Sequence, residues 1–280
     1  MPRENKVMEM VTLVTGSGSG IGRAIALEFA KSGHPVVVND IVHEAGKRVL
    51  SEIEAGGGEG SFIPADISNV IQVKSMFEKA RKKYGGVDIL VNNAGVPGPF
   101  SLVADMADET WHKTISIHLN GTFFCLREAA RLMMVAGFGR IINMASIAGL
   151  LGTVGSGEYG AAKAGIINLT MTAAKELGPF NITVNAIAPG MVGTPTNVKL
   201  KDKGSPFINT AIEGTPTGRM TDPEEIAKLI LFLSSEAAAN INGQVIRVDG
   251  GAGISIGMDD FMHSFLSKKS PTVMKIKSTE

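Results

Sequence analysis

Short runs of β-branched residues alternate with longer amphipathic segments along almost the whole chain, and this alternation constrains the fold more than any other feature. Seven runs predict strands, at Val11–Thr15, Val36–Asn39, Ser61–Pro64, Ile89–Asn92, Arg140–Met144, Thr183–Ile187 and Val245–Val248. Most of these runs are continuously apolar, as expected of strands buried on both faces of a parallel sheet. The segments between them predict helices near 20–32, 44–56, 70–84, 109–136, 158–178 and 223–235. The pattern therefore predicts an α/β fold, with about seven strands in one doubly wound parallel sheet and helices on both faces.

Two stretches depart from this alternation. Residues 194–219 contain Pro195, Pro206 and Pro216 and predict a long loop with at most a short helix, of the kind that covers a substrate site. Residues 254–280 contain one short predicted helix, Asp259–Leu266, whose apolar side chains would pack on the core, on a neighbouring subunit or over the substrate pocket. We therefore predict one domain at 1–253, with a substrate lid at 194–219, and a C-terminal extension at 254–280.

The composition excludes several classes of protein. The 280 residues include 27 basic and 27 acidic side chains, and this balance, without a basic run, argues against nucleic-acid binding. No run of about 18 apolar residues occurs, so we expect no membrane segment, and the polar N-terminus favours a cytoplasmic location. Cys125 is the one cysteine, so an intrachain disulfide is excluded and no metal site is predicted. The apolar neighbours of Cys125 favour a buried hydrophobe over a nucleophile.

A glycine-rich stretch follows the first predicted strand. Gly16, Gly18, Gly20 and Gly22 lie between Thr15 and the start of the first predicted helix. Glycines at such a turn let backbone N–H groups approach a phosphate, which the helix dipole also attracts. A P-loop is excluded because no Gly-Lys-Ser/Thr sequence follows, whereas a methyltransferase with a similar loop remains open. The position of this glycine loop predicts a dinucleotide site.

Asp40 ends the second predicted strand, 18 residues after Gly22, close to the spacing of about 20 at which an acid binds the adenosine ribose. Its carboxylate would accept a hydrogen bond from the 2′-hydroxyl and repel a 2′-phosphate. No basic residue precedes Arg23 in the glycine loop, and Ile41 follows Asp40. These features predict NAD rather than NADP as the cofactor. The alternative is that Asp40 only caps the next helix.

Five motifs occur in a fixed order between about residues 8 and 251. They are Thr15-Gly16-x-x-x-Gly20-x-Gly22, Asp66-Ile67, Asn92-Asn93-Ala94-Gly95, Ser146 with Tyr159-x-x-x-Lys163, and Pro189-Gly190 with Thr194. In this order they resemble the short-chain dehydrogenase/reductase family, whose single-domain members have a Rossmann fold. The resemblance implies that the cofactor is bound by Gly16, Ser19, Gly20, Ile21, Gly22, Asp40, Asp66, Ile67, Asn93, Ala94, Gly95, Tyr159, Lys163, Pro189, Gly190, Val192 and Thr194. It also implies a homotetramer in which the helices at 109–136 and 158–178 pack between subunits.

Tyr159 and Lys163 are four residues apart, so on a helix the phenol and the ammonium share one face. A phenol with a pKa of ~10 is a poor base at neutral pH. The Lys163 cation and the positive nicotinamide ring would lower that pKa, so that Tyr159 takes a proton from an alcohol while the alcohol carbon gives hydride to the ring. Ser146 would stabilise the substrate oxygen. The resemblance implies that Lys163 also binds the nicotinamide ribose. Taken singly, the Tyr–Lys pair is typical of a helix surface and the serine of a cap.

One position departs from the family pattern. Where the family has the Asn of an Asn-x-x-Gly stretch, this chain has His118, three residues before Gly121, and Asn120 lies two residues after it. In the family the backbone carbonyl at this position holds a water that links to the lysine, so any side chain would suffice. Alternatively, the imidazole relays protons. The four catalytic candidates are therefore Ser146, Tyr159, Lys163 and His118.

The predicted function is NAD-dependent interconversion of a secondary alcohol and a ketone. A 3-oxoacyl reductase that acts on carrier-protein or coenzyme A esters is the alternative within the family, although the helix end Met133–Gly137 lacks basic residues. Lys199, Lys201 and Lys203 in the predicted lid would attract a carboxylate or a coenzyme A ester, or form a solvated face. A non-catalytic NAD-binding subunit is the alternative outside the enzymes.

Overall fold

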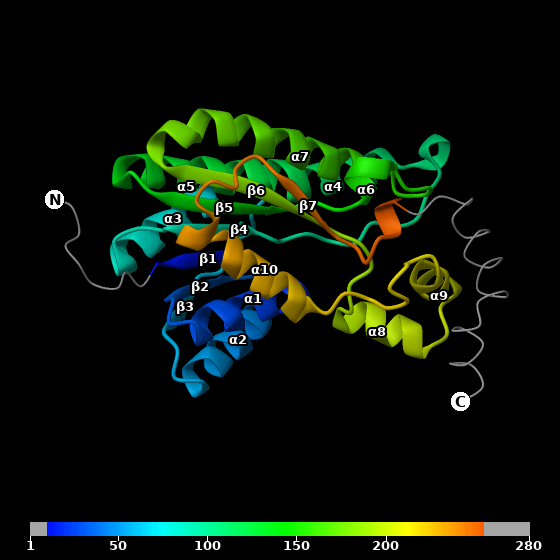
Figure 1. Cartoon of the computed structure of the whole chain (residues 1–280), viewed down its shortest axis with the longest axis horizontal. Coiled ribbons are helices and arrows are strands. Elements are labelled where there is room, and N and C mark those ends of the chain that lie inside the picture. Colours follow the sequence, from blue (N-terminus) through cyan, green and yellow to red (C-terminus); the bar gives the residue numbers. More distant parts are fainter. Residues whose placement is uncertain (1–9, 255–280) are drawn as a thin grey trace, which may run out of the picture.

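The computed structural model describes residues 10–254, and its centre is one sheet of seven parallel strands in the order β3-β2-β1-β4-β5-β6-β7 (Figure 1). The strands are Thr12–Thr15 (β1), Val36–Asn39 (β2), Gly60–Phe62 (β3), Ile89–Asn92 (β4), Gly139–Met144 (β5), Ile182–Pro189 (β6) and Val245–Val248 (β7). Every residue of β1, β2, β4, β5 and β6 is buried, because helices cover both faces of the sheet. The predicted doubly wound fold is confirmed.

Alternate residues of the strands enter two hydrophobic cores, one on each face of the sheet. Leu13 and Leu90 pack on one face with α3 (Val70–Tyr84), α5 (Gly121–Ala136) and α7 (Gly157–Leu177). Val14 and Val91 pack on the other with α1 (Gly20–Lys31), α2 (His43–Ala55) and α10 (Pro223–Leu233). Cys125 is fully buried in the first core, and burial raises the pKa of its thiol, as expected of a structural hydrophobe.

The strand order reverses at β1, which has β2 on one side and β4 on the other. In open parallel sheets, ligands bind at such a reversal, outside the carboxyl ends of the strands. Those ends point toward the end of the molecule that carries α6 (Ala148–Leu151), α8 (Pro195–Asp202) and α9 (Pro206–Glu213) (Figure 1). Short 3₁₀ turns occupy Val103–Asp105, Gly178–Phe180, Glu236–Ala238 and Ala252–Ile254.

The prediction of a long loop with at most a short helix at 194–219 was wrong, because this stretch contains both α8 and α9. Two of the three prolines that suggested a loop, Pro195 and Pro206, each occupy the first residue of a helix. That position has no intrahelical partner for its N–H, so proline is favoured there. Thr194 also caps α8, since its Oγ1 accepts a hydrogen bond from the backbone of Asn197.

The helix predicted at 109–136 is not regular throughout. It begins as α4 (Asp108–Ile115), widens into a π-helical turn at Ser116–Asn120, and continues as α5. The π turn contains His118, whose side chain is buried. Such a turn adds a residue to the helix and is frequent at functional sites.

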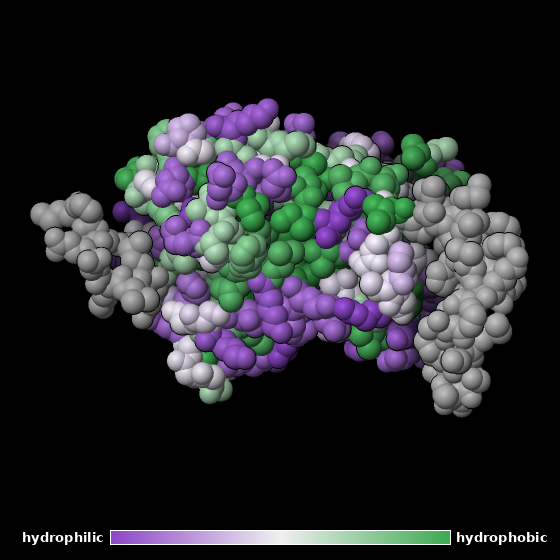
Figure 2. Space-filling view, viewed as in Figure 1, coloured by the Kyte–Doolittle hydropathy of each residue, from purple (hydrophilic) through white to green (hydrophobic). Residues whose placement is uncertain are grey.

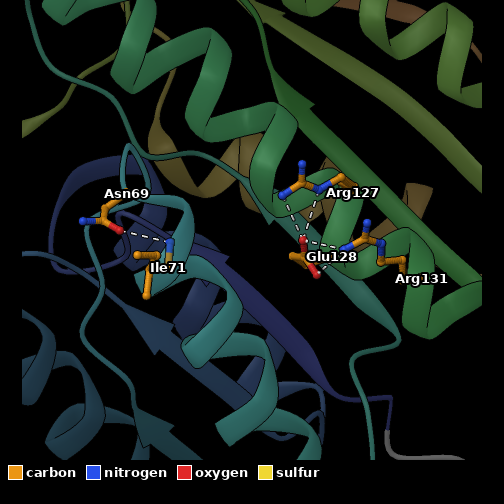
Figure 3. Close-up of polar contacts among 5 residues, drawn as sticks. All are labelled: Asn69, Ile71, Arg127, Glu128 and Arg131. Atoms are coloured by element: carbon orange, nitrogen blue, oxygen red, sulfur yellow. Dashed lines mark hydrogen bonds and ion pairs between the residues drawn. The ribbon is translucent and has the colours of Figure 1, made fainter.

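Side-chain contacts stabilise α3 and α5. The side-chain oxygen of Asn69 accepts hydrogen bonds from Ile71 (3.0 Å) and Gln72 (3.2 Å) and so caps α3. On α5, Glu128 forms ion pairs with Arg127 and Arg131, each at 3.0 Å (Figure 3).

Within 10–254, no helix is long and apolar enough to span a membrane. The predicted helix Asp259–Leu266 lies outside the described residues.

Candidate active site

The glycine loop between β1 and α1 is packed too closely for other residues. A Cβ atom on Gly16 would lie 2.6 Å from the Cα of Ala94, and one on Gly22 would lie 2.3 Å from the carbonyl oxygen of Gly16. Gly16 and Gly20 have φ values of +62° and +53°, in the left-handed region. Ser19 precedes α1 but its side chain does not cap the helix, and the first turn has no acidic residue. The backbone N–H groups at this helix end therefore fit a phosphate.

Asp40 lies against the glycine loop. Its Oδ2 accepts a hydrogen bond from the backbone of Gly18 at 2.9 Å, and its Oδ1 accepts one from Val42, at the start of α2, at 2.8 Å. Asp40 therefore does contact the next helix, as the alternative interpretation held, but it also borders the loop predicted to bind the dinucleotide. Each carboxylate oxygen keeps a further lone pair, with which it can accept from a ribose hydroxyl.

The Asn92-Asn93-Ala94-Gly95 segment joins the glycine loop to the catalytic candidates. The side-chain nitrogen of Asn93 donates to the carbonyl oxygens of Thr15 and Gly16, each at 3.0 Å, while Thr15 Oγ1 accepts from the backbone of Asn93 and Ala94. At the other end of the segment, a Cβ on Gly95 would lie 2.4 Å from the His118 ring. The segment thus fixes two parts of the site relative to each other.

Asp66 and Ile67 follow β3. Asp66 accepts hydrogen bonds from the backbone and hydroxyl of Ser68, at 2.9 and 2.7 Å. The side chain of Ile67 is buried in the first core, against Gly121. The described contacts of these two side chains are therefore structural, and their predicted contacts with the adenine remain a prediction.

The Pro189-to-Thr194 segment follows β6 and returns to the glycine loop. Val192 is buried in the second core, and its carbonyl oxygen accepts from the backbone of Thr194 at 2.8 Å. A Cβ on Gly20 would lie 3.5 Å from Thr194 Cγ2. A Cβ on Gly190 would lie 2.9 Å from the Cβ of Asp249. The structure therefore brings the segment predicted to hold the nicotinamide beside the loop predicted to hold the phosphates.

Ser146, Tyr159 and Lys163 come together at the carboxyl end of β5. Tyr159 lies in the first turn of α7, close enough to the Ser146 hydroxyl for that group to lower the pKa of the phenol. Lys163 is one turn further along α7, with its Nζ 5.5 Å from the centroid of the Tyr159 ring. That Nζ donates to the carbonyl oxygen of Met144 at 2.5 Å. The predicted shared face of the phenol and the ammonium is thus present.

Burial has the largest effect on the pKa values of Lys163 and Tyr159. It lowers the pKa of Lys163 to about 7, because the ammonium loses its hydration. It raises the pKa of Tyr159, and the hydrogen bond with Ser146 opposes that rise. The direction for Tyr159 is opposite to the one predicted from Lys163 and a nicotinamide ring together. In the protein alone, burial therefore outweighs the groups that would lower the pKa of Tyr159.

His118 stands beside Tyr159. Their rings meet edge to face, with centroids 5.3 Å apart and an interplanar angle of 88°. His118 Nε2 lies 2.9 Å from the carbonyl oxygen and 3.2 Å from the nitrogen of Val96, while Nδ1 is buried without a hydrogen-bond partner in the described part of the chain. Burial and the nearby Lys163 cation lower the pKa of His118 to about 4. The imidazole is therefore neutral at pH 7.

Sequence reasoning missed Glu158, the residue before Tyr159. Its side chain is fully buried, and neither carboxylate oxygen has a hydrogen-bond partner within residues 10–254. A Cβ on Gly98, in the loop after β4, would lie 2.3 Å from Glu158 Oε1. The signal was available, because Glu158 is the one charged side chain between Arg140 and Lys163.

Comparisons with known proteins agree with this geometry. A family model described as enoyl-(acyl carrier protein) reductase matches residues 16–253. The 3-oxoacyl-[acyl-carrier-protein] reductase FabG of Thermotoga maritima is 40% identical over 241 residues, which are 86% of this chain and 96% of that protein. The crystal structure of levodione reductase has a TM-score of 0.83 at 32% identity, covering 90% of this chain and 100% of that one. A variant of actinorhodin polyketide ketoreductase with NADPH also gives 0.83, at 33% identity, over 88% and 98% of the two chains.

The chain therefore belongs to the short-chain dehydrogenase/reductase family. It is an oxidoreductase, and its family uses nicotinamide cofactors. The glycine loop and the Pro189-to-Thr194 segment can hold such a dinucleotide across the ends of β1 and β6. The cluster around Tyr159 can bind one oxygen atom and move one proton at it.

Proposed function

We propose that this protein interconverts a secondary alcohol and a ketone with NAD as its cofactor. The cluster of Ser146, Tyr159 and Lys163 at the end of β5 is the observation that carries the proposal. A buried phenol next to a hydroxyl is suited to bind the oxygen of an alcohol and to exchange its proton. The cluster borders the glycine loop through the Asn93 segment, so a bound dinucleotide and the substrate would meet at this end of the sheet.

The preference for NAD over NADP rests on Asp40. Its carboxylate sits at the glycine loop, and none of the ion pairs in the described region involves it. A 2′-phosphate placed there would be repelled by an unneutralised carboxylate. The polyketide ketoreductase is a complex with NADPH, so the preference for NAD in this chain rests on the charge of Asp40 alone. Asp40→Ser should therefore raise kcat/KM for NADPH relative to NADH, and an unchanged ratio would contradict this assignment.

The residues of the cluster have separate roles in this proposal. NAD⁺ bound along the glycine loop would accept the hydride from the substrate carbon. Tyr159 takes the hydroxyl proton in oxidation and returns it to the carbonyl oxygen in reduction. Ser146 donates a hydrogen bond to that oxygen as its charge develops. Lys163, in its charged form, favours phenolate at Tyr159 and holds the nicotinamide ribose.

His118 acts mainly through its position. The ring contacts Tyr159 on one side and the backbone of Val96 on the other. Its low pKa makes it a poor carrier of a proton at neutral pH, which favours the interpretation that the backbone at this position is what the reaction needs. The alternative is that the imidazole relays protons through Nδ1, which is buried and has no hydrogen-bond partner within residues 10–254. Variants of His118 test this alternative directly.

The experiment that tests the proposal is the formation of NADH, followed at 340 nm, over a panel of secondary alcohols. Tyr159→Phe should lose roughly 10²- to 10⁴-fold in kcat, as expected for a positioned acid/base group, while its affinity for NAD stays unchanged. Full activity in Tyr159→Phe would refute the mechanism. Binding of NAD without turnover of any alcohol or ketone would instead favour a non-catalytic subunit.

A 3-oxoacyl reductase is the second candidate, since it reduces a ketone with the same groups. The 40% identity to FabG of Thermotoga maritima favours it. Acetoacetyl-coenzyme A, tested beside simple ketones with NADH and NADPH, distinguishes the two. A strong preference for the thioester with NADPH would favour the second candidate.

We also propose a cytoplasmic homotetramer of single-domain subunits. Trp111 on α4, Phe123 on α5 and Met171 on α7 are large apolar side chains exposed on the helices that the family resemblance assigns to subunit contacts. Equilibrium sedimentation would measure the mass directly. A monomer at micromolar concentration would contradict this assembly.

A further inference from the structure

Large apolar side chains are exposed where three segments leave the carboxyl ends of β4, β5 and β6. We call this surface the apolar mouth, and its members are 49% to 87% exposed. It consists of Phe100, Leu102, Val103, Leu151, Val154 and Phe207. Figure 2 shows hydrophobic surface over α6 and over the neighbouring loop between β4 and α4, at the end of the molecule that carries α9.

The three segments form one surface because they contact each other. The backbone of Ser101 donates to Gly155 at 2.9 Å, and these two stretches run parallel at a bridge between Ser101 and Ser156. The ring of Phe100 packs on that of Phe207 from α9, with centroids 4.9 Å apart. A Cβ on Gly155 would lie 3.3 Å from the Phe100 ring. The residues of the apolar mouth therefore form one continuous surface and are not scattered. We call this surface the rim of the site.

The rim is continuous with the catalytic cluster. Its first segment follows Gly95, which lies against His118, and its second runs from Ser146 to Tyr159. Val103 lies near Gly157, two residues before Tyr159, where a Cβ would approach it to 3.2 Å. The rim therefore borders the position at which a substrate oxygen would meet Tyr159.

The rim also carries no basic residue, and Asp105, which shares a 3₁₀ turn with Val103, is acidic and exposed. Residues 93–104, 145–157 and 204–212 contain no Asp, Glu, Lys, Arg or His. The nearest lysines of the lid, Lys199, Lys201 and Lys203, belong to α8 and its end, and they are exposed. Contiguous exposed apolar surface on a protein marks a binding site for apolar groups. A ligand that binds by charge would instead need ionic partners at the rim.

We propose that the apolar mouth binds the non-reacting part of the substrate and that this part is uncharged, apolar and bulky, a ring system or a hydrocarbon chain of at least several carbons. This inference rests on the proposed function, because it assigns the substrate class of that same site. The substrate then enters as a free ketone or alcohol, and its apolar body packs between the Phe100–Phe207 pair and the Leu151–Val154 loop. A protein-bound or coenzyme A-bound substrate would place an anionic carrier at a rim that has no basic residue to bind it.

The test uses the full chain and the series 2-butanol, 2-hexanol, 2-octanol and 2-decanol with NAD. We expect kcat/KM to rise roughly twofold to fourfold for each added methylene, from the transfer of about 0.8 kcal/mol per buried CH₂. Phe207→Ser and Val154→Lys should flatten that rise, so that the loss of kcat/KM grows from 2-butanol to 2-decanol. Phe180→Ser is the matched control, since Phe180 is also exposed but lies before β6, at the opposite end of that strand.

Four results would overturn the inference. A flat series in the unaltered protein would show that the mouth does not bind the substrate. Faster turnover of an acetoacetyl thioester that is lost in Lys199→Ala/Lys201→Ala/Lys203→Ala would show a charged carrier instead. A change of mass on sedimentation in Phe207→Ser, or tighter 2-decanol binding in Phe261→Ser/Phe265→Ser, would show that a second copy or the C-terminal residues occupy the mouth.

Titration calorimetry with 2-decanone distinguishes failure of this inference from failure of the proposed function. Binding with a negative heat-capacity change that weakens in Phe207→Ser supports the mouth even if no turnover occurs. Turnover of short alcohols without such binding supports the function and overturns the mouth.

Discussion

Replacing Lys163 by methionine should make the protein more stable and nearly inactive, and the gain in stability should depend on pH. Lys163 is 4% exposed, and burial lowers its pKa from 10.5 to about 7. Between these values the unfolded chain binds a proton that the folded protein does not, so stability rises with pH across this window. The arithmetic of that shift gives a destabilisation from Lys163 of ~4 kcal/mol at pH 7 and ~2 kcal/mol at pH 9.

The variant also loses the hydrogen bond to the carbonyl oxygen of Met144, which costs roughly 1 kcal/mol. Lys163→Met should therefore exceed the unaltered protein by ~3 kcal/mol at pH 7 and by ~1 kcal/mol at pH 9. Urea unfolding at several pH values from 6.5 to 9 measures this gap. The series stops at pH 9 because Tyr159, with its raised pKa, contributes its own change above pH 10.

Lys175→Met is the control, because Lys175 lies on the same helix and is exposed. It should follow the pH dependence of the unaltered protein. The reasoning is refuted if the gap between Lys163→Met and the unaltered protein is the same at every pH. In that case the pKa of Lys163 is the same in the folded protein and in the unfolded chain, and other groups offset the cost of burying its ammonium.

Three further predictions concern the same site. Burial lowers the pKa of His118 from 6.5 to about 4, so the free energy of unfolding should fall by roughly 2–3 kcal/mol as the pH drops from 6.5 to 4. In His118→Asn this fall should be much smaller. Unchanged turnover in both His118→Asn and His118→Ala would exclude a required imidazole. Gly22→Ala should lower the stability by roughly 1–3 kcal/mol and also weaken NAD binding, because the new Cβ meets the backbone of Gly16. Gly86→Ala is the control and should change neither property, because the space around Gly86 is open. Thermal unfolding measures the stability, and cofactor titration measures the affinity. Glu158→Gln should raise the free energy of unfolding by roughly 1–3 kcal/mol, because it removes a buried carboxylate that has no hydrogen-bond partner within residues 10–254. A loss of stability in urea would mean that another group binds the carboxylate.

The fold could be predicted from the sequence because its signals are local and repeated. Each buried strand is a short apolar run, and each crossover helix has its own amphipathic period. The glycine loop and Asp40 could be placed for the same reason, since both directly follow strands and all strands of a parallel sheet end at one edge. The Tyr159–Lys163 spacing predicted a shared helix face, which α7 provides.

The features that escaped prediction depend on contacts distant in the sequence or on ambiguous local signals. Pro195 and Pro206 read as loop residues because proline breaks a helix interior and equally well starts a helix. The raised pKa of Tyr159 follows from burial, which a single sequence does not show. Glu158 stands out in the sequence as the one charged side chain between Arg140 and Lys163, but its burial depends on the distant contact with Gly98.

The two proline-started helices also bear on how the predicted lid at 194–219 would move. Because α8 and α9 are already formed, an entering ligand would not have to order a disordered loop, whose fixation would cost roughly 1–2 kcal/mol per residue. The predicted lid would instead pivot as two short rods, with the left-handed Gly204 between them and Gly193 and Gly218 near its ends. Opening and closing of such a lid would involve few torsions, so substrate entry and product release would rearrange only the residues at these joints.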